Sequence, residues 1–592
     1  MRVIDMPDWS YHVIFKPILN KLSPVTSREF IHKGMNRIAS LPCGPHIINF
    51  LGREESFPSL SRHIDGLTFS NPVGLSGKVD PFLSGTKAFA NLGFGFLEIG
   101  PVSLQGTKNL SDPLVDYEDL QICFPEGESL GLKSVTERLK NIKKKQPIFI
   151  RITGTDHELQ AMVGELEKTA DAFIVDNLLV PLTSDKPIYL AISNPSELSV
   201  NELHQFSGIV LELGEQYTPD NFLKVKQLRE KGFSKTILTS GSILEPQDAL
   251  HLLEAGADSV MLSGGYVFSG PGLTKRIKEA LVSKEAPPAL QPGWFAYWLF
   301  GLFIFLGGVL ALIFSITSIV LPYDELFLGM KKEEIWAYNK RIMLFMAHDR
   351  MTLAGTMISG GIVYMNLAKY GVRNQLRWAK QAIDKAAIVG FLGIFAFIGF
   401  GYFDWLHLLF WLVLLPFYIV GFIKTKGIRG TPSSKNRRNH RIWKASLLGQ
   451  FLFVLLGFSF VLGGVIISLY GVTTVFVPTD LLYLCMTPEM LEAFNERLIP
   501  VIAHDRAGFG SALLSVGLLV LLLALWGFQQ GNRWVWRTFL FGGLPAFIAG
   551  IYVHFAIGYT SFIHLLPAYF AIMLYIGGLV TTYRYFHKDT DM

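Results

Sequence analysis

The chain of 592 residues is long enough for two or more domains. Half of its residues are hydrophobic, only 17% are charged, and the formal net charge is +5. Charged residues are common before about residue 290 and afterwards gather between long apolar runs, which indicates a membrane topology and argues against a nucleic-acid partner. The cysteines Cys43, Cys123 and Cys485 lie far apart without metal-ligand spacing, so they support neither a disulfide framework nor a zinc site.

Residues 1–60 form the first predicted segment, which is helical. Its apolar side chains recur at helical spacing, at Val13, Ile14, Phe15, Ile18, Leu19 and Leu22. We expect amphipathic helices that either pack on the next domain or form a membrane-facing entrance. The first residues, with Asp5 and Asp8, lack the basic and then apolar pattern of a signal peptide, so we expect the first half of the chain in the cytoplasm.

Residues 61–282 alternate short apolar strands with helical stretches. The expected strands are Val73–Leu75, Gly95–Ile99, Ile148–Ile152, Ala172–Val175, Ile188–Ala191, Gly208–Leu211, Ile237–Thr239 and Ser259–Leu262. Eight such strands with intervening helices predict an α/β fold with a parallel sheet, most simply a (β/α)₈ TIM barrel.

A linker at 283–292 leads into a predicted all-α polytopic membrane domain. Its apolar runs have the length needed to cross a bilayer. We expect eight spans, at 293–321, 346–368, 386–403, 406–424, 446–476, 506–528, 536–557 and 561–583. They divide into a first repeat of four spans at 293–444 and a second at 445–592.

The loops between the expected spans differ in charge. The loop from Lys424 to Lys444 is rich in Lys and Arg and holds no acidic residue, whereas the loops after spans one and five carry several Asp and Glu residues. The positive-inside rule then places the basic loops, the barrel and the C-terminus in the cytoplasm. We expect an integral protein of a bacterial plasma membrane.

The membrane half also repeats itself in sequence, at an offset of 156 or 157 residues. The matching pairs include Leu321 to Met330 with Val477 to Met486, Asn339 and Arg341 with Asn495 and Arg497, and His407 with His564. Each unit has an even number of expected spans, so both should share one orientation, related by a pseudo-two-fold axis along the membrane normal.

Glycine- and serine-rich stretches follow the last two expected barrel strands. They contain Ser240, Gly241 and Ser242 after one strand and Ser263, Gly264 and Gly265 after the other. Backbone N–H groups and a helix N-terminus at this rim of a TIM barrel can hold a phosphate group. The rim predicts a phosphorylated ligand.

Several stretches of residues 8–281 resemble the class 2, quinone-linked dihydroorotate dehydrogenases. They are the run from Asn71 through Gly77 to Asp80, the run Leu92 to Gly100, and the terminal motif Leu262 to Gly272 with the preceding Ala255 to Ser259. The resemblance implies a TIM barrel that binds FMN, with Gly77 and Asp80 among the cofactor contacts. It also implies an oxidoreductase that passes electrons to a membrane quinone.

The positions that carry the chemistry of that family hold other residues here. The family's lysine after the first-loop aspartate is Pro81, a threonine is Pro101, and a flavin-contacting asparagine is Arg151. The serine base aligns with Leu179, the flavin-binding lysine with Ala191, and a Thr-Asn pair with Glu212 and Leu213.

These replacements predict a degenerate active site. A proton-abstracting enzyme needs a positioned base, and Asp176 is the one nearby candidate, so the catalytic residues stay unknown. Acidic side chains at Glu126, Glu128 and Glu212 would repel an anionic orotate.

A repeated cluster of ionisable residues is expected in the membrane half. It comprises His348, Asp349, Arg350, His504, Asp505, Arg506, His407 and His564. Ionisable groups inside a membrane are costly and usually pair with one another, so the cluster fits a structural hydrogen-bond network. A lipid or quinone headgroup site, haem and a metal are alternatives. Haem is disfavoured because the histidines lie at one edge without a second, inner pair.

Two classes of function remain open from sequence. One is an FMN-dependent dehydrogenase linked to quinone. The other is a pseudoenzyme barrel that binds a phosphorylated ligand such as FMN and serves the membrane domain, which binds or transports a lipid-like substrate. We favour the second hypothesis.

Overall fold

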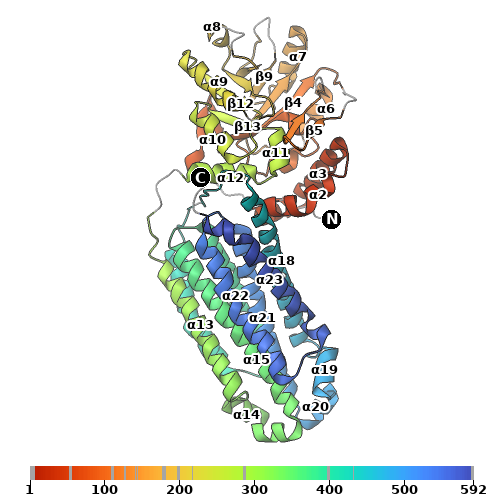
Figure 1. Cartoon of the computed structure of the whole chain (residues 1–592), viewed down its shortest axis with the longest axis vertical. Coiled ribbons are helices and arrows are strands. Elements are labelled where there is room, and N and C mark those ends of the chain that lie inside the picture. Colours follow the sequence, from red (N-terminus) through yellow and green to blue (C-terminus); the bar gives the residue numbers. More distant parts are fainter. Residues whose placement is uncertain are drawn as a thin grey trace. The chain divides into compact units, whose positions relative to one another are not determined.

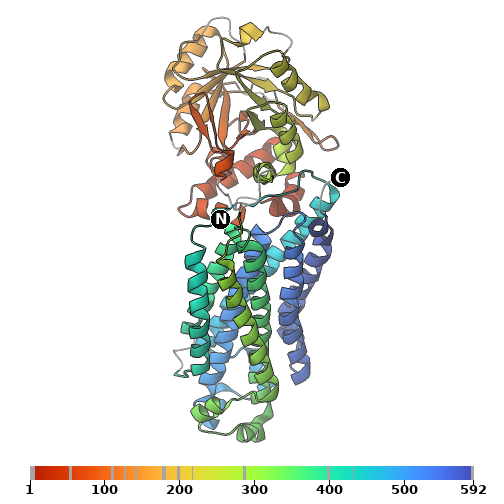
Figure 2. The same cartoon turned by 90° about the vertical axis from the view of Figure 1, so that its left-hand side faces the viewer.

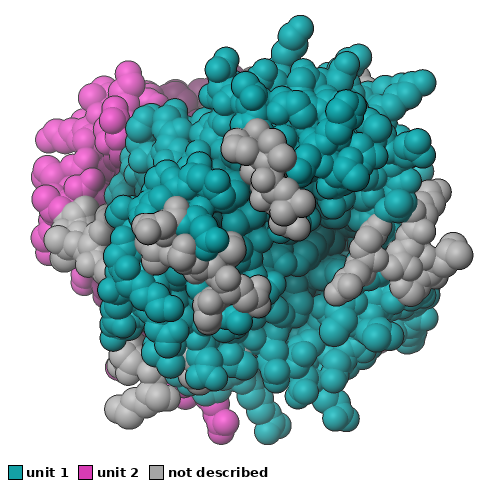
Figure 3. All heavy atoms as spheres, turned by 90° about the horizontal axis from the view of Figure 1, so that it is seen from above, with its two compact units in different colours: residues 1–286, 432–447, 590–592 teal, residues 287–431, 448–589 magenta. Residues whose placement is uncertain are grey.

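The computed structural model divides into two compact units. Unit 1 contains residues 1–286, 432–447 and 590–592, and unit 2 contains residues 287–431 and 448–589 (Figure 3). Within them the structure describes residues 7–52, 57–107, 112–125, 128–140, 142, 144–176, 182–195, 200–216, 218–283, 289–396, 401–430 and 432–588.

Unit 1 is built around a closed parallel barrel (Figures 1 and 2). Its strands are β3 (Val73–Leu75), β4 (Phe96–Ser103), β8 (Ile148–Ile152), β9 (Ala172–Val175), β10 (Ile188–Ile192), β11 (Gly208–Glu212), β12 (Thr236–Ser240) and β13 (Ser259–Leu262). The pairing runs from β3 through β13, β12, β11, β10, β9 and β8 to β4, and β3 also pairs with β4, which closes the ring. This confirms the predicted TIM barrel, with each expected strand in place.

Large apolar side chains fill the inside of the barrel. Phe96, Phe149 and Tyr189 are fully buried and pack ring against ring. A hairpin of β1 (Arg62–Ile64) and β2 (Leu67–Phe69) contributes Phe69 to the same cluster. The interior is therefore a packed core, and chemistry is left to the rim at the carboxyl ends of the strands.

Helices and short strands surround the barrel. The helices are α5 (Thr86–Phe89), α6 (Leu132–Leu139), α7 (Asp156–Leu166), α8 (Val200–Leu203), α9 (Pro219–Glu230), α10 (Pro246–Glu254), α11 (Gly264–Ser269) and α12 (Leu273–Val282), with 3₁₀ turns η2 (Pro58–Leu60) and η3 (Gly77–Val79). The strands β5 (Leu114–Asp116) and β6 (Gln121–Cys123) form a hairpin, and β7 (Leu130–Gly131) pairs with β4.

The N-terminal segment is helical, as expected. It contains α1 (Asp8–Ser10), a π-helical turn η1 (Tyr11–Phe15), α2 (Lys16–Leu19), α3 (Pro24–Ala39) and α4 (Gly44–Gly52). Asp8 ties it to the barrel, because its carboxylate accepts the Gly272 backbone N–H at 3.0 Å and lies 3.0 Å from Arg276.

Residues 432–447 belong to unit 1 although they lie far along the chain. The Asn439 backbone N–H donates to Glu245, and its side-chain amide donates to the Leu244 carbonyl and to the Ser269 hydroxyl. The Arg276 guanidinium lies 4.3 Å over the Trp443 ring. The basic loop predicted from sequence is therefore packed on the barrel.

Unit 2 is a helical bundle in which short helices connect the long ones. They are α13 (Trp294–Thr317), α14 (Pro322–Leu328), α15 (Lys332–Asn366), η4 (Leu367–Val372), α16 (Arg377–Leu392), η5 (Gly393–Ala396), α17 (Trp405–Lys424), α18 (Arg441–Val472, which begins in unit 1), α19 (Pro478–Leu484), α20 (Pro488–Phe494), α21 (Leu498–Trp526), α22 (Arg533–Ile557) and α23 (Phe562–His587).

Seven helices in the described part of the chain are long and apolar enough to cross a membrane. They correspond to seven of the eight expected spans. At the third expected span, 386–403, α16 ends at Leu392 and residues 397–400 lie outside the described residues. The difference from the expected eight falls at that segment.

In unit 2, each half of the sequence repeat makes a matching hydrogen bond to the other half. The Asn339 amide donates to the Leu484 carbonyl at 3.0 Å, and the Asn495 amide donates to the Leu328 carbonyl at 3.0 Å. Both asparagines leave helical geometry, with φ of −155° and −158°. Equivalent positions of the repeat thus make equivalent bonds to each other's short helix.

Candidate functional sites in the barrel and the helical domain

Arg151 lies at the centre of an ion network at the rim of the barrel. It reaches three carboxylates: Glu98 lies within β4, Asp176 directly follows β9, and Glu212 ends β11. Its Nε lies 2.6 Å from Glu98, its Nη1 lies 2.7 Å from Asp176, and its Nη2 lies 2.7 Å from Glu212. The Lys78 Nζ lies 3.2 Å from Glu212 on the other side. The flavin-contact and Thr-Asn positions of the resembled family are therefore joined here by an ion pair.

The network has more carboxylates than cations. Burial and the neighbouring charges together shift the pKa values of its members. Burial disfavours the charged form of Asp176 and raises its pKa, against the pull of Arg151. Burial acts on Glu212 in the same direction, but Arg151 and Lys78 hold its pKa below the usual value. The three carboxylates in turn raise the pKa of Arg151 in spite of its burial. Arg151 is consequently a permanent charge at this rim.

The first-loop residues predicted to contact a cofactor are bonded within the protein. The Gly77 backbone N–H donates to Glu98 at 3.0 Å. The buried Asp80 carboxylate accepts the N–H of Ser84 at 2.8 Å and the Thr86 hydroxyl at 2.8 Å. Asp80 thus holds the loop that enters α5.

The predicted phosphate rim assembles at the ends of β12 and β13. Ser240 ends β12 and Gly241 follows it. Gly265 packs so closely on the loop after β12 that an added Cβ would lie 2.0 Å from the Ile243 carbonyl oxygen. Ser242, with a φ of +61°, accepts the Asn221 amide at 2.8 Å. The residues predicted to form the rim therefore lie together at the ends of β12 and β13.

A carboxylate occupies the centre of that rim. Glu215, from the loop after β11, accepts the Ser263 hydroxyl at 2.7 Å and the Gly264 backbone N–H at 2.7 Å. Burial raises the pKa of Glu215 above its usual value, although both donors favour its charged form. The two donors at this rim can bind an anion, and here that anion is the carboxylate of Glu215.

FMN, which the family resemblance implies, does not fit the residues in this arrangement. Its phosphate needs the donors that Glu215 holds, and an added Cβ on Gly264 would already lie 2.6 Å from the Glu215 carboxylate. The Arg151 network fills the rim beside it with buried charges. A phosphate group has to displace Glu215 before it can reach Gly264.

Sequence reasoning found some of these residues and missed others. Asp176, Arg151 and Glu212 were singled out, and the structure brings them into one network. Leu179, the aligned base position, and Glu126 lie outside the described residues. Lys78, Glu98 and Glu215 were missed. A buried acid in a strand and an acid in a loop have no motif, so no sequence pattern pointed to Glu98 or Glu215.

An apolar pocket lies between the N-terminal helices and the barrel, with an empty volume of about 1020 Å³ that includes its open mouth. Leu19, Ile31 and Met35 line it from the helices, and Val79 and Phe89 line it from the barrel. A pocket with mainly apolar walls suits a hydrophobic ligand.

The predicted polar cluster of the membrane half forms two reciprocal groups. The Arg350 guanidinium donates to Asp505 at 2.7 Å and to Asp324 at 2.8 Å. Arg506 lies 3.3 Å from Asp349 and 2.5 Å from Asp480. Each arginine therefore holds one aspartate of its own half and one of the other half.

The predicted histidines fall into two separate groups. His348 and His564 come together with His554, and His407 and His504 come together with Asp404. His554 and Asp404 were missed from sequence, because the repeat has no histidine at the position equivalent to His554 and no aspartate equivalent to Asp404.

The curated relatives that resemble this chain are quinone-linked dihydroorotate dehydrogenases. One from Chelativorans sp. (strain BNC1) is 25% identical over 366 residues, which cover 48% of this chain and 92% of the relative. One from Sulfurovum sp. (strain NBC37-1) is 22% identical and covers 47% of this chain and 94% of the relative. No family model matches the chain.

The chain is also similar to solved structures of dihydroorotate dehydrogenase. The dihydroorotate dehydrogenase of Eimeria tenella in complex with ferulenol is 18% identical and aligns over 46% of this chain and 94% of that chain, with a TM-score of 0.36. These matches leave the helical region uncovered. The barrel half of this chain is thus similar to quinone-linked dihydroorotate dehydrogenases over nearly their whole length, and it is joined to a helical region with seven candidate membrane helices among the described residues.

Proposed function

We propose that the barrel is a catalytically degenerate, dihydroorotate-dehydrogenase-like module that serves the membrane domain. The observation that carries this proposal is the Glu215 carboxylate on the Ser263 and Gly264 donors. A site that uses its own acid as the anion does not depend on a resident flavin. A phosphorylated ligand binds there in exchange for Glu215.

The Arg151 network supports the loss of the original reaction. Dihydroorotate is anionic, and Glu98, Glu212 and Asp176 present three carboxylates against two cations, Arg151 and Lys78, at this rim. Such a surface disfavours a second anion unless cations compensate it. Asp176 is held in the ion pair with Arg151 and is a poor general base there.

The membrane domain is proposed to bind a lipid-like or quinone ligand. A second apolar pocket, with an empty volume of about 890 Å³ including its open side, lies among α13, α15, α16, α17 and α21. Its wall includes His407 and the aromatic side chains Phe391 and Trp411. A mainly apolar pocket with a few polar groups, among them His407, Ser511 and Ser515, suits a ligand with a polar head and an apolar body. We further propose that the domain is a duplication in a bacterial plasma membrane, with the barrel and C-terminus in the cytoplasm.

The test uses the full-length protein, purified in detergent. We expect no flavin absorption band and no quinone reduction with dihydroorotate. The Glu215→Ala variant should bind inorganic phosphate at least tenfold more tightly than the unsubstituted protein, because losing the internal competitor is worth about 1.4 kcal/mol or more. Glu230→Ala, an exposed acid on α9, is the matched control and should leave phosphate binding unchanged.

The alternative is an active FMN-dependent oxidoreductase that passes electrons to quinone. The apolar pocket beneath the N-terminal helices favours it, since that pocket fits a hydrophobic acceptor. Stoichiometric flavin in the purified protein, together with dihydroorotate-dependent quinone reduction, would establish the alternative and overturn the degenerate-barrel proposal.

A further inference from the structure

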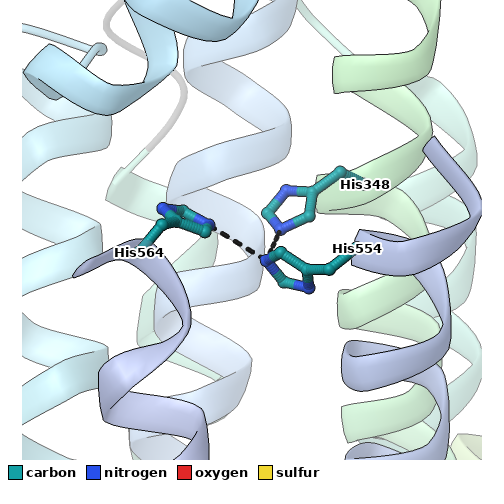
Figure 4. A group of neighbouring side chains, drawn as sticks. All are labelled: His348, His554 and His564. Atoms are coloured by element: carbon teal, nitrogen blue, oxygen red, sulfur yellow. Dashed lines mark hydrogen bonds between the residues drawn. The ribbon is translucent and has the colours of Figure 1, made fainter. Parts of the chain in front are cut away.

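Three histidines of unit 2 direct the same ring nitrogen toward one point. They come from three helices: His348 from α15, His554 near the end of α22 and His564 near the start of α23 (Figure 4). The Nε2 atoms of His348 and His554 lie 2.9 Å apart, and those of His564 and His554 also lie 2.9 Å apart. His348 and His554 are buried, at 5% and 7% exposed.

The other ring nitrogens determine which tautomers are present. The Nδ1 atom of His554 lies 2.5 Å from the Gly550 carbonyl oxygen, which can only accept a hydrogen bond. The Nδ1 atom of His348 lies 2.9 Å from the Asp349 carboxylate, which also accepts. Both Nδ1 atoms therefore carry the proton, and in the neutral rings both Nε2 atoms present lone pairs.

Two lone pairs that face each other at 2.9 Å need a cation between them. An extra proton could join His348 and His554, but one proton bridges only two ring nitrogens. Figure 4 shows that His564 approaches the same point from the opposite side. A metal ion can accept a lone pair from each of the three ring nitrogens at once.

The spacing is close to that of a tetrahedral metal site. Zinc–nitrogen bonds of about 2.0–2.1 Å place neighbouring ligand nitrogens about 3.3 Å apart. One ligand nitrogen of each histidine lies within 4.8 Å of those of the other two, and the two Nε2–Nε2 distances of 2.9 Å need to lengthen by only a few tenths of an ångström. Metal-bound histidines commonly donate their other N–H to a carboxylate or a backbone carbonyl, as His348 and His554 do.

The charges around the group also favour a cation. Asp349 contacts His348, and the ring of Tyr559, which donates to Asp480, stacks 4.0 Å from His564. Arg506 is the cation paired with both of these aspartates. Two carboxylates against one guanidinium leave one negative charge beside three neutral rings.

The other half of the repeat carries a related arrangement. There His504, whose Nδ1 lies 3.4 Å from Asp505, comes together with His407 and Asp404, and their possible ligand atoms also lie within 4.8 Å of one another. In both groups, a histidine that precedes an aspartate lies near a histidine of the other half of the repeat. His348 lies near His564 on α23, and His504 lies near His407 on α17. The two groups differ in the third ligand, which is His554 in one and Asp404 in the other.

We propose that His348, His554 and His564 bind one divalent first-row transition-metal ion through their Nε2 atoms. Imidazole ligands suit zinc, copper, nickel and iron, and three nitrogens leave a position open for a further ligand.

The test uses the full-length protein in detergent, stripped with a chelator and titrated with Co²⁺ alone. Four-coordinate Co²⁺ with nitrogen ligands gives visible d–d absorption, and one equivalent of it should be lost in His554→Gln. His587→Gln, at the far end of α23, is the matched control and should keep the whole signal. Zn²⁺ should bleach the wild-type signal by competition.

Further measurements separate a metal site from a merely structural hydrogen-bond network. If His554→Gln does not fold, His564→Gln replaces it, since His564 is only half-buried. Zn²⁺ should raise the Tm of the stripped wild type, and the rise should be smaller in the folded variant. The proposal is overturned if stripped wild type takes up no Co²⁺, or if the folded variant takes up as much as wild type.

Discussion

The Arg151 guanidinium and the Glu212 carboxylate lie 2.7 Å apart across the rim of the barrel. The resemblance implies uncharged residues at these two positions, whereas here Arg151 also pairs with Glu98 and Asp176, and Glu212 also pairs with Lys78. A buried charge that loses its partner costs several kcal/mol, whereas a matched pair roughly breaks even. The two replacements are therefore energetically coupled.

This coupling predicts the effect of restoring the family residues. Arg151→Asn alone should lower the free energy of unfolding by about 3–5 kcal/mol, because the buried Glu98 then lacks its cation and Glu212 keeps only Lys78. The double variant Arg151→Asn/Glu212→Thr should lose less than the sum of the single variants. Thermal unfolding of the full-length protein in detergent measures this, and additive losses would contradict the coupling.

Asp248 predicts a pH dependence. It lies at the start of α10, accepts the N–H groups of Leu244 and Glu245, and burial raises its pKa to about 7. A raised pKa means that the stability due to this carboxyl is complete below about pH 4 and is lost as the pH rises toward 7. The wild type should therefore lose about 3–4 kcal/mol relative to Asp248→Asn across this range.

The measurement is the unfolding midpoint of both proteins between pH 4 and 8. Asp258→Asn is not a suitable control, because Asp258 is paired with Arg229. Asp220 on α9 is suitable, because it has no ion-pair partner among the described residues. Asp220→Asn should follow the wild-type profile. Parallel profiles for wild type and Asp248→Asn would contradict the assignment.

The sequence predicts the barrel well because buried parallel strands appear as short apolar runs. Val73–Leu75 and Ala172–Val175 are examples that match their strands. It predicts the close packing at the ends of β12 and β13 because glycines such as Gly265 are needed where backbones approach closely. It does not predict that Glu215 fills this rim, since a loop acid reaches it only through the tertiary fold. His554 was missed because the repeat places Phe397 at its equivalent position.

The exchanged asparagines predict a matched pair of effects. Asn339→Ala and Asn495→Ala each remove a bond of 3.0 Å to a carbonyl oxygen of the opposite half. Each should lower the free energy of unfolding by about 1–3 kcal/mol, and the two losses should agree within about 0.5 kcal/mol. Unfolding in detergent measures both, with the exposed Asn374→Ala as the control. A loss confined to one of the two variants would contradict an equivalent role in the two halves.

The pocket beneath the N-terminal helices predicts the effect of filling it. Met35 is buried on α3 and lines the pocket, so Met35→Trp should occupy space that a hydrophobic ligand needs. The dissociation constant for a short-chain ubiquinone should rise about tenfold or more, which corresponds to a loss of about 1.4 kcal/mol. Phe30→Trp is the matched control, because Phe30 lies on the same helix, is 60% exposed and does not line the pocket.

Equilibrium dialysis of the quinone against full-length protein in detergent gives the measurement. Overpacking can destabilise a core by about 1–3 kcal/mol, so the Tm of Met35→Trp has to be recorded as well. If the variant is folded and binds the quinone as tightly as wild type, the ligand does not enter this pocket. In that case the apolar pocket beside His407 in the helical domain becomes the quinone site to test, because its walls have the same apolar character.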